Sequence, residues 1–367
     1  MKTLILYYDS YHTPLDSICE RLPNRDLVVL HVRLDDDDQE PPAAGSESYC
    51  LDARERFADC YLARAIKANA CYQDGYYLSA ALSRPLLAEI CVEQALKLGA
   101  DTIVHGFAGN DHLRFSAGVR SLAPSLAVIN VRDICGSRTA ANAAAYTISS
   151  NLWGSSIESG SLSDPSCPPS AKIWPDGSSS DAERHEISFE SGVPAELDGC
   201  RLSLALLISQ LNCVGRRFMI GRTDLVEHGY VGLKTRAVYD APAASILIHA
   251  HHDLEHYVSS RRQARFKRLV DAEWTELVYD GCWFDPARLT CERYIDHVNE
   301  RVTGAVEVEL LSGGERVLSR RSPFALYDER RAVYRAGQDF GSHLIEELAV
   351  QHSLAAITGA GLECPQR

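Results

Sequence analysis

The first 135 residues alternate short apolar segments with longer helical ones, and this alternation limits the possible folds more than any other feature. Four segments rich in β-branched residues predict buried strands, at 4–8, 27–32, 102–105 and 126–131. Segment 84–99 has apolar side chains at helical spacing and ends at a glycine. Repeated strand–helix–strand units predict an α/β fold with a doubly wound parallel sheet. Ligands of such sheets bind beyond the carboxyl ends of the strands.

The second half of the chain has a different pattern, because its predicted strands come in adjacent pairs. Segments 185–199 and 305–320 alternate polar and apolar residues, which predicts two hairpins, the second with its turn at 312–315. Segment 203–212 predicts an apolar helix, and segment 243–257 predicts a strand that leads into a helix. This half is therefore expected to be an α+β domain.

We expect three regions in the chain. An α/β domain covers residues 1–145, an α+β domain covers 146–335, and a helical tail covers 336–367. The long loop at 159–184 is rich in serine and proline, and we expect it to cross between domains.

Charge and cysteine content limit the partners and the environment. The net charge of −13 argues against nucleic acid and anionic membranes as partners, because both bind basic faces. No apolar stretch approaches the roughly 18 residues that a membrane span needs. The twelve cysteines include no C-x-x-C pair, which predicts free thiols in a reducing compartment. The chain opens on a predicted strand without a leader segment, so we expect a cytoplasmic protein.

The segment HAHHDLEH raises the hypothesis of a metal site. His252 and His256 are four residues apart, with Asp253 and Glu255 between them, which is a spacing compatible with zinc. The alternative is a helix that begins near this segment, with both acidic residues in its first turn. We favour the helix start and predict no metal.

Polar side chains gather after the strand predicted at 102–105. The segment HGFAGNDHLRF places Asn110, Asp111 and Arg114 there, and such a mixture can pair with both charged groups of an amino acid. The segment YTISSNLWGSSIESG adds hydroxyl and carboxylate groups from Thr147, Ser149, Ser156 and Glu158. These residues predict a site for a small polar ligand such as an amino acid. The alternative is a capped helix start whose polar groups satisfy one another.

Long collinear segments between residues 1 and 330 resemble argininosuccinate synthase. They include YYLSAALSRPLLAE, HGFAGNDHLRF, YTISSNLWGSSIESGSLSDP, MIGRTDLVEHGYVGLKTRAVYDAPAASILIHAHHDLE, ELVYDGCWFDP, VTGAVEVELL and RRSPFALYD. The resemblance implies a nucleotide-binding domain of the PP-loop ATPase type (HUP-like), a synthetase domain and a homotetramer. It also implies a reaction in which ATP activates the ureido oxygen of citrulline and the amine of aspartate then displaces AMP.

The resemblance assigns roles to individual residues. Residues that match the citrulline-binding groups of the family are Tyr76, Arg114, Thr147, Ser156, Glu227 and Tyr239. The family has a serine five residues after the tyrosine, and Ala81 stands there instead. Arg84 and Asp111 are the expected catalytic residues, and Asn110, Asp111 and Glu158 would orient the amine donor.

The first strand-to-helix turn departs most from the family. The family has a glycine-rich turn whose backbone N–H groups hold pyrophosphate. Here the turn at 9–14 contains no glycine, and Pro14 lacks an N–H group. The degenerate nucleotide loop comprises Asp9, Ser10, His12, Asp16 and Ser17. The aspartate-binding turn of the family is also two residues shorter here and lacks its threonine and lysine.

These departures leave three hypotheses about function. The first is an altered C–N ligase for a citrulline-like ureido or guanidino amino acid and an amine such as aspartate, in a specialised pathway, with ordinary ATP binding changed or lost. The second is a conventional ATP-dependent argininosuccinate synthase with an unusual loop. The third is a non-catalytic relative that binds an amino acid or a partner protein. ATP and Mg²⁺ are expected as ligands only if the altered loop still binds nucleotide.

Overall fold

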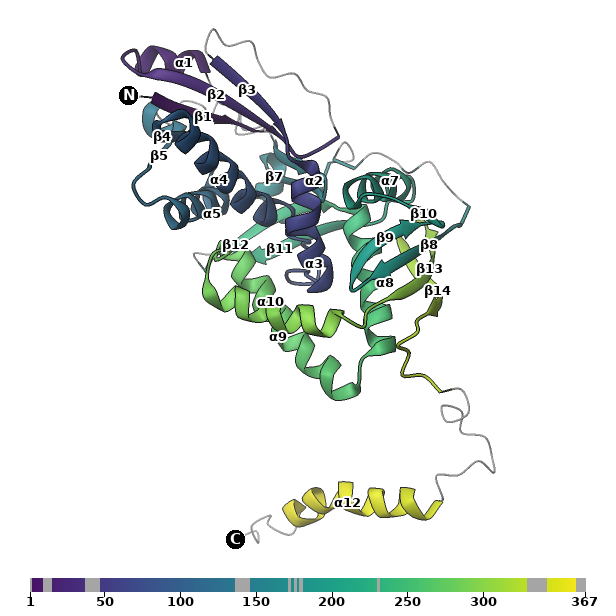
Figure 1. Cartoon of the computed structure of the whole chain (residues 1–367). Helices are drawn as coiled ribbons and strands as arrows, with labels where there is room; N and C mark the ends of the chain where they lie inside the picture. The colour runs from purple at the N-terminus through teal and green to yellow at the C-terminus, as the bar shows by residue number, and fades with distance from the viewer. Residues whose placement is uncertain are drawn as a thin grey trace. The chain divides into compact units, whose positions relative to one another are not determined.

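The structure is a computed structural model, and it describes residues 2–8, 15–36, 47–135, 146–170, 173–174, 177, 181–229, 232–328 and 342–360. The chain up to Ala325 packs into one compact unit, and residues from Leu326 onward form a second (Figure 1). The second unit contains the helix α12 (Ser342–Ala360), which confirms the predicted terminal helix.

A five-stranded parallel sheet in the order β3-β2-β1-β4-β5 opens the first unit. Its strands are β1 (Lys2–Tyr7), β2 (Asp26–Arg33), β3 (Glu47–Asp52), β4 (Ala100–His105) and β5 (Ala127–Asn130). The doubly wound sheet is confirmed. The sequence analysis missed β3 because this edge strand has no buried residue and therefore lacks the apolar run of its neighbours.

Helices cover both faces of this sheet, because successive side chains of a strand point to opposite faces. Ile5 and Val104 pack with Leu15 and Ile18 of α1 (Leu15–Arg21) and with Val131 of α6 (Val131–Cys135). The alternate strand residues belong to the main core, which includes α4 (Ser79–Leu98) and α5 (Gly109–Leu122). Figure 1 shows α1 on one side of the sheet and α4 and α5 on the other.

The predicted helix at 84–99 is confirmed and is longer than expected. It begins at Ser79, where the Tyr76 hydroxyl accepts hydrogen bonds from the N–H groups of Ala80 and Ala81 (both 3.1 Å). It ends at Gly99, whose φ of +68° allows its N–H to bond back to the last turn.

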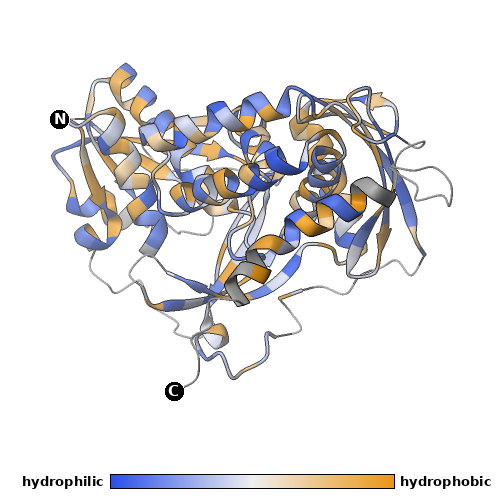
Figure 2. Ribbon diagram, turned by 90° about the horizontal axis from the view of Figure 1, so that it is seen from below, coloured by the Kyte–Doolittle hydropathy of each residue, from blue (hydrophilic) through white to orange (hydrophobic). Residues whose placement is uncertain are grey.

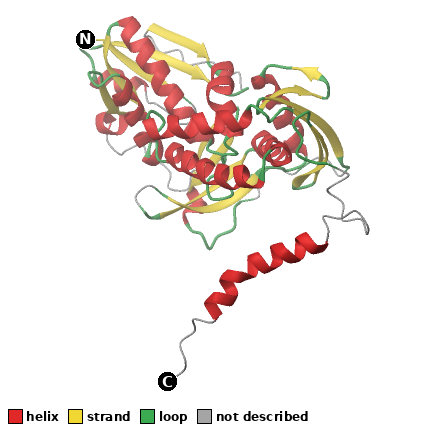
Figure 3. Ribbon diagram, turned by 60° about the horizontal axis from the view of Figure 1, so that its bottom comes forward, coloured by secondary structure: helices red, strands yellow, loops and turns green. Residues whose placement is uncertain are grey.

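Two antiparallel sheets follow. One has four strands in the order β11-β12-β7-β6: β6 (Tyr146–Asn151), β7 (Gly154–Ser159), β11 (Arg222–His228) and β12 (Lys234–Asp240). The other has the order β10-β9-β8-β13-β14: β8 (Glu183–Glu190), β9 (Val193–Leu197), β10 (Cys200–Arg201), β13 (Gly304–Leu311) and β14 (Gly314–Arg321). Both predicted hairpins are confirmed, as is the α+β character of this half (Figure 3).

The remaining helices pack around these sheets. They are α2 (Arg54–Phe57), the π-helix η1 (Ala58–Leu62), α3 (Ala63–Lys67), the short 3₁₀ helix η3 (Gly160–Ser163), α7 (Leu204–Arg217), α8 (Pro242–Val258), α9 (Arg261–Tyr279) and α10 (Pro286–Asn299). Figure 2 shows hydrophobic and hydrophilic residues interspersed along the helices, as expected for helices packed on one side.

The expected strand at the start of segment 243–257 was wrong, because this whole segment lies in α8. Most of its apolar residues are buried, and a fully buried helix has the same continuous apolar pattern as a buried strand. Pro242 occupies the first turn of the helix. Asp253 and Glu255 therefore lie near the end of the helix, and the expectation of a first turn there was also wrong.

Three findings bear on the expectations about metals, thiols and membranes. Across the described residues, no group of three or more His, Cys, Asp and Glu side chains could hold a metal ion. Every cysteine within the described ranges is a free thiol. No helix in the part of the chain that the structure describes is long and apolar enough to cross a membrane.

Candidate active site

The candidate site lies where the start of α5 meets one face of the four-stranded sheet. Directly opposed residues of antiparallel strands share a face. The register pairs Thr147 with Glu158, Ser149 with Ser156, and Ser156 with Tyr239, so all five side chains share one face. The sequence pattern could not show this, because it depends on the order of the strands.

A buried ion cluster centres on Asp111 in the first turn of α5. One carboxylate oxygen pairs with Arg84 at 2.8 Å and the other with Arg114 at 3.0 Å. Arg84 also donates to the Ser149 hydroxyl at 2.9 Å. Burial alone would raise the pKa of Asp111, but the two guanidinium groups hold it below its ordinary value. Two cations and one anion leave the cluster with a net positive charge.

Arg114 provides a group that points to an anionic ligand. Its Nη1 binds Asp111, and its Nε donates to the Tyr279 carbonyl at 2.7 Å. Its Nη2 is buried and has no hydrogen-bond partner among the described residues. An unpaired buried guanidinium nitrogen is costly unless a ligand completes it, and a carboxylate is the matching ligand.

Glu227 on β11 is held by two tyrosines. The Tyr239 hydroxyl donates to one carboxylate oxygen at 2.9 Å. The Tyr279 hydroxyl shares its proton between the other oxygen at 3.0 Å and the His228 carbonyl at 2.8 Å. Burial raises the pKa of Glu227, although these two hydrogen bonds act in the opposite direction. Asn110 donates to the Tyr279 hydroxyl at 3.2 Å, which joins this group to α5.

Stacked aromatic rings form the wall beside Glu227. Tyr76 stacks on Tyr239 with 4.4 Å between ring centroids, and Tyr72 stacks on Tyr279 at 3.7 Å. The two pairs join the segment before α4 to β12 and to the end of α9. Because Tyr239 and Tyr279 are held by this stacking, they hold the Glu227 carboxylate in one orientation.

Glu158, on β7, shares the sheet face with Ser156 and Tyr239 and has a strongly altered proton affinity. Desolvation by the surrounding protein atoms and the negative charges of Asp111 and Glu227 raise the pKa of Glu158 to about 7. Glu158 nevertheless keeps part of its surface in contact with solvent. A carboxylate with this pKa can exchange a proton with a substrate near neutral pH.

The edge of the parallel sheet next to this cluster is aromatic. Tyr8 follows β1 and Phe107 follows β4, and the Arg84 guanidinium lies 5.2 Å from the Tyr8 ring and 4.5 Å from the Phe107 ring. His105 is also buried here, and burial lowers its pKa to about 3, so it is neutral. Arg84 therefore places a positive charge at the carboxyl edge of the parallel sheet, between two aromatic rings.

The structure joins most of the residues predicted from the sequence. Contacts that pass through Tyr279 link seven of these residues into one cluster: Arg84, Asp111, Arg114, Asn110, Glu227, Tyr239 and Tyr76. Ser156 and Glu158 face it from β7. Thr147 shares the sheet face, but its hydroxyl contacts Ser159 at 3.4 Å and no cluster residue. The predicted loop residues Asp9, Ser10 and His12 lie outside the described residues, and Asp16 and Ser17 lie on α1 without described side chains.

Sequence reasoning missed several residues of the cluster, above all Tyr279. Tyr279 bonds Glu227, accepts from Asn110 and provides the carbonyl for Arg114. It lies in ELVYDGCWFDP, one of the segments that resemble the family, but the resemblance assigned no role to this tyrosine. Tyr8 and Phe107 were also missed, because each continues the apolar pattern of its strand.

Comparisons with known proteins give a consistent result for both halves. Residues 33–151 match the family model described as "Arginosuccinate synthase N-terminal HUP domain", and residues 146–358 match "Arginosuccinate synthase C-terminal domain". The first match begins at residue 33, so β1 and α1 precede it.

Similar curated proteins share the same name. Argininosuccinate synthase of Dictyoglomus turgidum is 38% identical over 336 residues, covering 85% of each chain. That of Pyrococcus furiosus is 39% identical over 330 residues, covering 84% of this chain and 80% of its own. That of Hyperthermus butylicus is 37% identical over 366 residues, covering 92% of each.

Proposed function

The chain belongs to the argininosuccinate synthase family, and we propose that it is a C–N ligase that joins a citrulline-like ureido amino acid to aspartate in an ATP-dependent reaction. The similar proteins favour this conventional activity over the other two hypotheses, since they bear the name of the synthase. They give no support to a specialised pathway or to a non-catalytic role.

The observation that carries this proposal is the buried, unpartnered Nη2 of Arg114 within the positive cluster around Asp111. A ligand carboxylate would complete this nitrogen and balance the charge. The carboxylate of Glu227, fixed by Tyr239 and Tyr279, would then accept N–H groups from the ureido end of the ligand. The carboxylate end of the ligand would thus bind Arg114, and its ureido end would bind Glu227.

The chemistry requires a nucleophilic amine. The ureido oxygen attacks the α-phosphorus of ATP and pyrophosphate leaves, and the amine nitrogen then forms a bond to the ureido carbon as AMP departs. Aspartate carries an ammonium group at neutral pH, so a base must take a proton before the nitrogen can attack. Glu158 suits this role, because its pKa is raised to about 7 and it faces the cluster.

Nucleotide binding is the part of this proposal that rests on the family. The turn at 9–14, where the family holds phosphate, lies outside the described residues. The adjacent described residues supply one cation, Arg84, between two aromatic rings. In the family reaction, ATP turns the ureido oxygen into a leaving group, and this chain's own residues would bind and orient the two amino acids.

An isotope experiment tests the proposed chemistry. Citrulline with ¹⁸O in its ureido group is incubated with the enzyme, Mg²⁺-ATP and aspartate, and AMP is examined by mass spectrometry. The proposal expects ¹⁸O in AMP together with a product that contains both amino acids. Product with unlabelled AMP would contradict activation through the ureido oxygen, and an absence of product would contradict the ligase activity.

A further inference from the structure

The segment 261–269, which begins α9, is strongly basic in a chain whose net charge is −13. It contains no acidic residue, and its exposed basic side chains are Arg261, Arg262, Arg265 and Arg268. Phe266 and Leu269 lie among these arginines and are 53% and 65% exposed. These six residues are called the α9 patch. The reaction proposed above does not use them.

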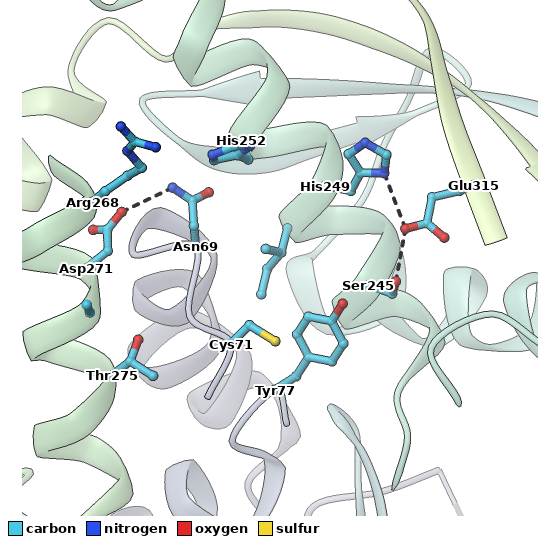
Figure 4. A pocket seen from close by; sticks show the side chains of 12 residues that line it. Asn69, Cys71, Tyr77, Ser245, His249, His252, Arg268, Asp271, Thr275 and Glu315 are labelled. Carbon is cyan, nitrogen blue, oxygen red and sulfur yellow. Dashed lines mark hydrogen bonds and ion pairs between the residues drawn. The ribbon is translucent and has the colours of Figure 1, made fainter. Parts of the chain in front are cut away.

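The arginines of the α9 patch have no hydrogen bond or ion pair with any residue that the structure describes. The first acidic residue after them on α9 is Asp271, three residues beyond Arg268. Its carboxylate is bound by Lys267 at 2.6 Å and by Asn69 at 3.3 Å (Figure 4). By contrast, exposed arginines of β10 and β14 pair with carboxylates: Arg201, Arg316 and Arg321. The guanidinium groups of the α9 patch are therefore available to an anionic partner.

The arrangement of these arginines does not stabilise the helix. Arg261 and Arg262 occupy the first turn, where the helix dipole is positive and cations are unfavourable. Arg265 lies four residues after Arg261 and three before Arg268, and like charges at these spacings repel one another. A local sequence that opposes its own element is expected at functional sites, where another contact compensates for the cost. The α9 patch therefore indicates an anionic partner.

The apolar residues of the α9 patch narrow the class of partner. Phe266 lies four residues after Arg262 and three before Leu269, so these side chains form one strip along the helix. The Phe266 ring packs edge-to-face against Tyr294 of α10, with 5.0 Å between ring centroids. A phosphate group gains nothing from Leu269. A polypeptide that carries both carboxylates and apolar side chains gains from the whole strip.

We propose that the α9 patch is a docking surface for an acidic segment of a partner protein, in which apolar residues recur among glutamates or aspartates. The carboxylates of this segment would bind the guanidinium groups through paired hydrogen bonds, and its apolar side chains would cover Phe266 and Leu269. Segment 261–269 is about 13 Å long, which matches a partner helix of about nine residues. The net negative charge of the chain opposes a long polyanion such as nucleic acid. This docking surface is independent of the ligase chemistry.

Fluorescence anisotropy with the full chain tests this proposal. The probe is a labelled peptide of about twelve residues, about 18 Å long as a helix, with leucine at every third or fourth position and glutamate elsewhere. In one control peptide glutamine replaces every glutamate, and in the other serine replaces every leucine. We expect the first peptide to bind and both controls to bind about tenfold more weakly. The affinity of the first peptide should fall as added salt screens the charges.

Substitutions in the chain locate the binding. The double variant Arg262→Gln, Arg265→Gln should weaken binding of the first peptide about tenfold. It should not lower the melting temperature, because it removes like-charge repulsion within α9. The matched control is Arg120→Gln, Arg216→Gln, which changes the net charge equally at exposed positions of α5 and α7. Leu269→Ser should weaken binding of the leucine peptide and leave binding of the serine peptide unchanged.

Several outcomes would overturn the proposal. They are no binding of the first peptide, equal binding of the glutamine peptide, and unchanged affinity in the double variant at positions 262 and 265. Tighter binding of an oligouridylate of the same length would assign the surface to nucleic acid instead. Self-association in sedimentation that only this double variant loses would assign it to a second copy of the chain. Ligase activity of the variant should equal that of the parent enzyme, so failure of either proposal leaves the other standing.

Discussion

Asp111 is the residue on which the buried charges of the site depend. It is the shared partner of Arg84 and Arg114, and all three side chains are at most one-tenth exposed. Removing one partner of a buried ion pair leaves an uncompensated charge in a medium that solvates it poorly. The same arrangement that prepares the site for an anionic ligand therefore makes it sensitive to substitution.

Asp111→Asn should destabilise the protein by about 3 kcal/mol, because both buried guanidinium groups lose their counter-charge. Urea unfolding measures this change. Asp253→Asn is the matched control, since Asp253 pairs with Arg320 at the surface, where an ion pair contributes less than about 1 kcal/mol. Equal losses in the two variants would show that the Asp111 cluster has no special role in stability.

Glu158 should set the pH dependence of the reaction. A base acts in its deprotonated form, and the pKa of Glu158 is raised to about 7. The rate should therefore rise by about tenfold per pH unit below pH 7 and level off above it. The informative quantity is the ratio of kcat/KM between the parent enzyme and Glu158→Gln across pH, because this ratio cancels the titration of the substrates. A ratio that does not vary with pH would rule out Glu158 as the base.

The two tyrosines that fix Glu227 should control affinity for the ureido substrate. Tyr239→Phe and Tyr279→Phe each remove one hydrogen bond to a buried carboxylate, worth about 1.5 kcal/mol or more. Each should raise the KM for citrulline about tenfold. Tyr146→Phe is the control, because Tyr146 lies on β6 of the same sheet and its hydroxyl contacts only Ser161 of η3 among the described residues. An unchanged KM in both active-site variants would contradict the assignment of Glu227 to the substrate-binding site.

At the scale of elements, the sequence predicted strands and helices where a short apolar run, a regular alternation of polar and apolar residues, or a turn residue marked them. The parallel strands, both hairpins and the glycine stop of α4 were predictable for this reason. The start of α8 was not, because a helix buried on most sides has the continuous apolar pattern of a buried strand. β3 was missed because a solvent-exposed edge strand has little apolar signal.

The glycine that ends α4 offers a test at this scale. Gly99 has a φ of +68°, and a Cβ added there would meet no atom within 4 Å. Gly99→Ala should therefore destabilise the protein by about 1 kcal/mol through backbone strain alone. Gly314→Ala is the control, because its Cβ would also lie in open space but its φ is not positive. A loss of stability at Gly314 as large as that at Gly99 would contradict the assignment of strain.

At the scale of the whole molecule, the site is assembled from distant parts of one compact unit. Asp111 follows the parallel sheet, Ser149 and Glu227 come from the antiparallel sheet, and Tyr279 ends α9. The residue pattern indicated Asp111 and Ser149 and the resemblance indicated Glu227, but neither identified Tyr279 or showed which of these residues meet. Contacts such as Tyr279 with Glu227, 52 residues apart, depend on how the sheets and α9 pack.

The central claim is that this assembled site performs an ATP-dependent ligation despite the unusual turn at 9–14. The most direct measurement is the release of pyrophosphate from Mg²⁺-ATP by the purified full chain, with citrulline and aspartate present together and each omitted in turn. Our account predicts release that requires citrulline and continues to turnover only when aspartate is present. No release with both substrates, together with no ATP binding by calorimetry, would contradict it.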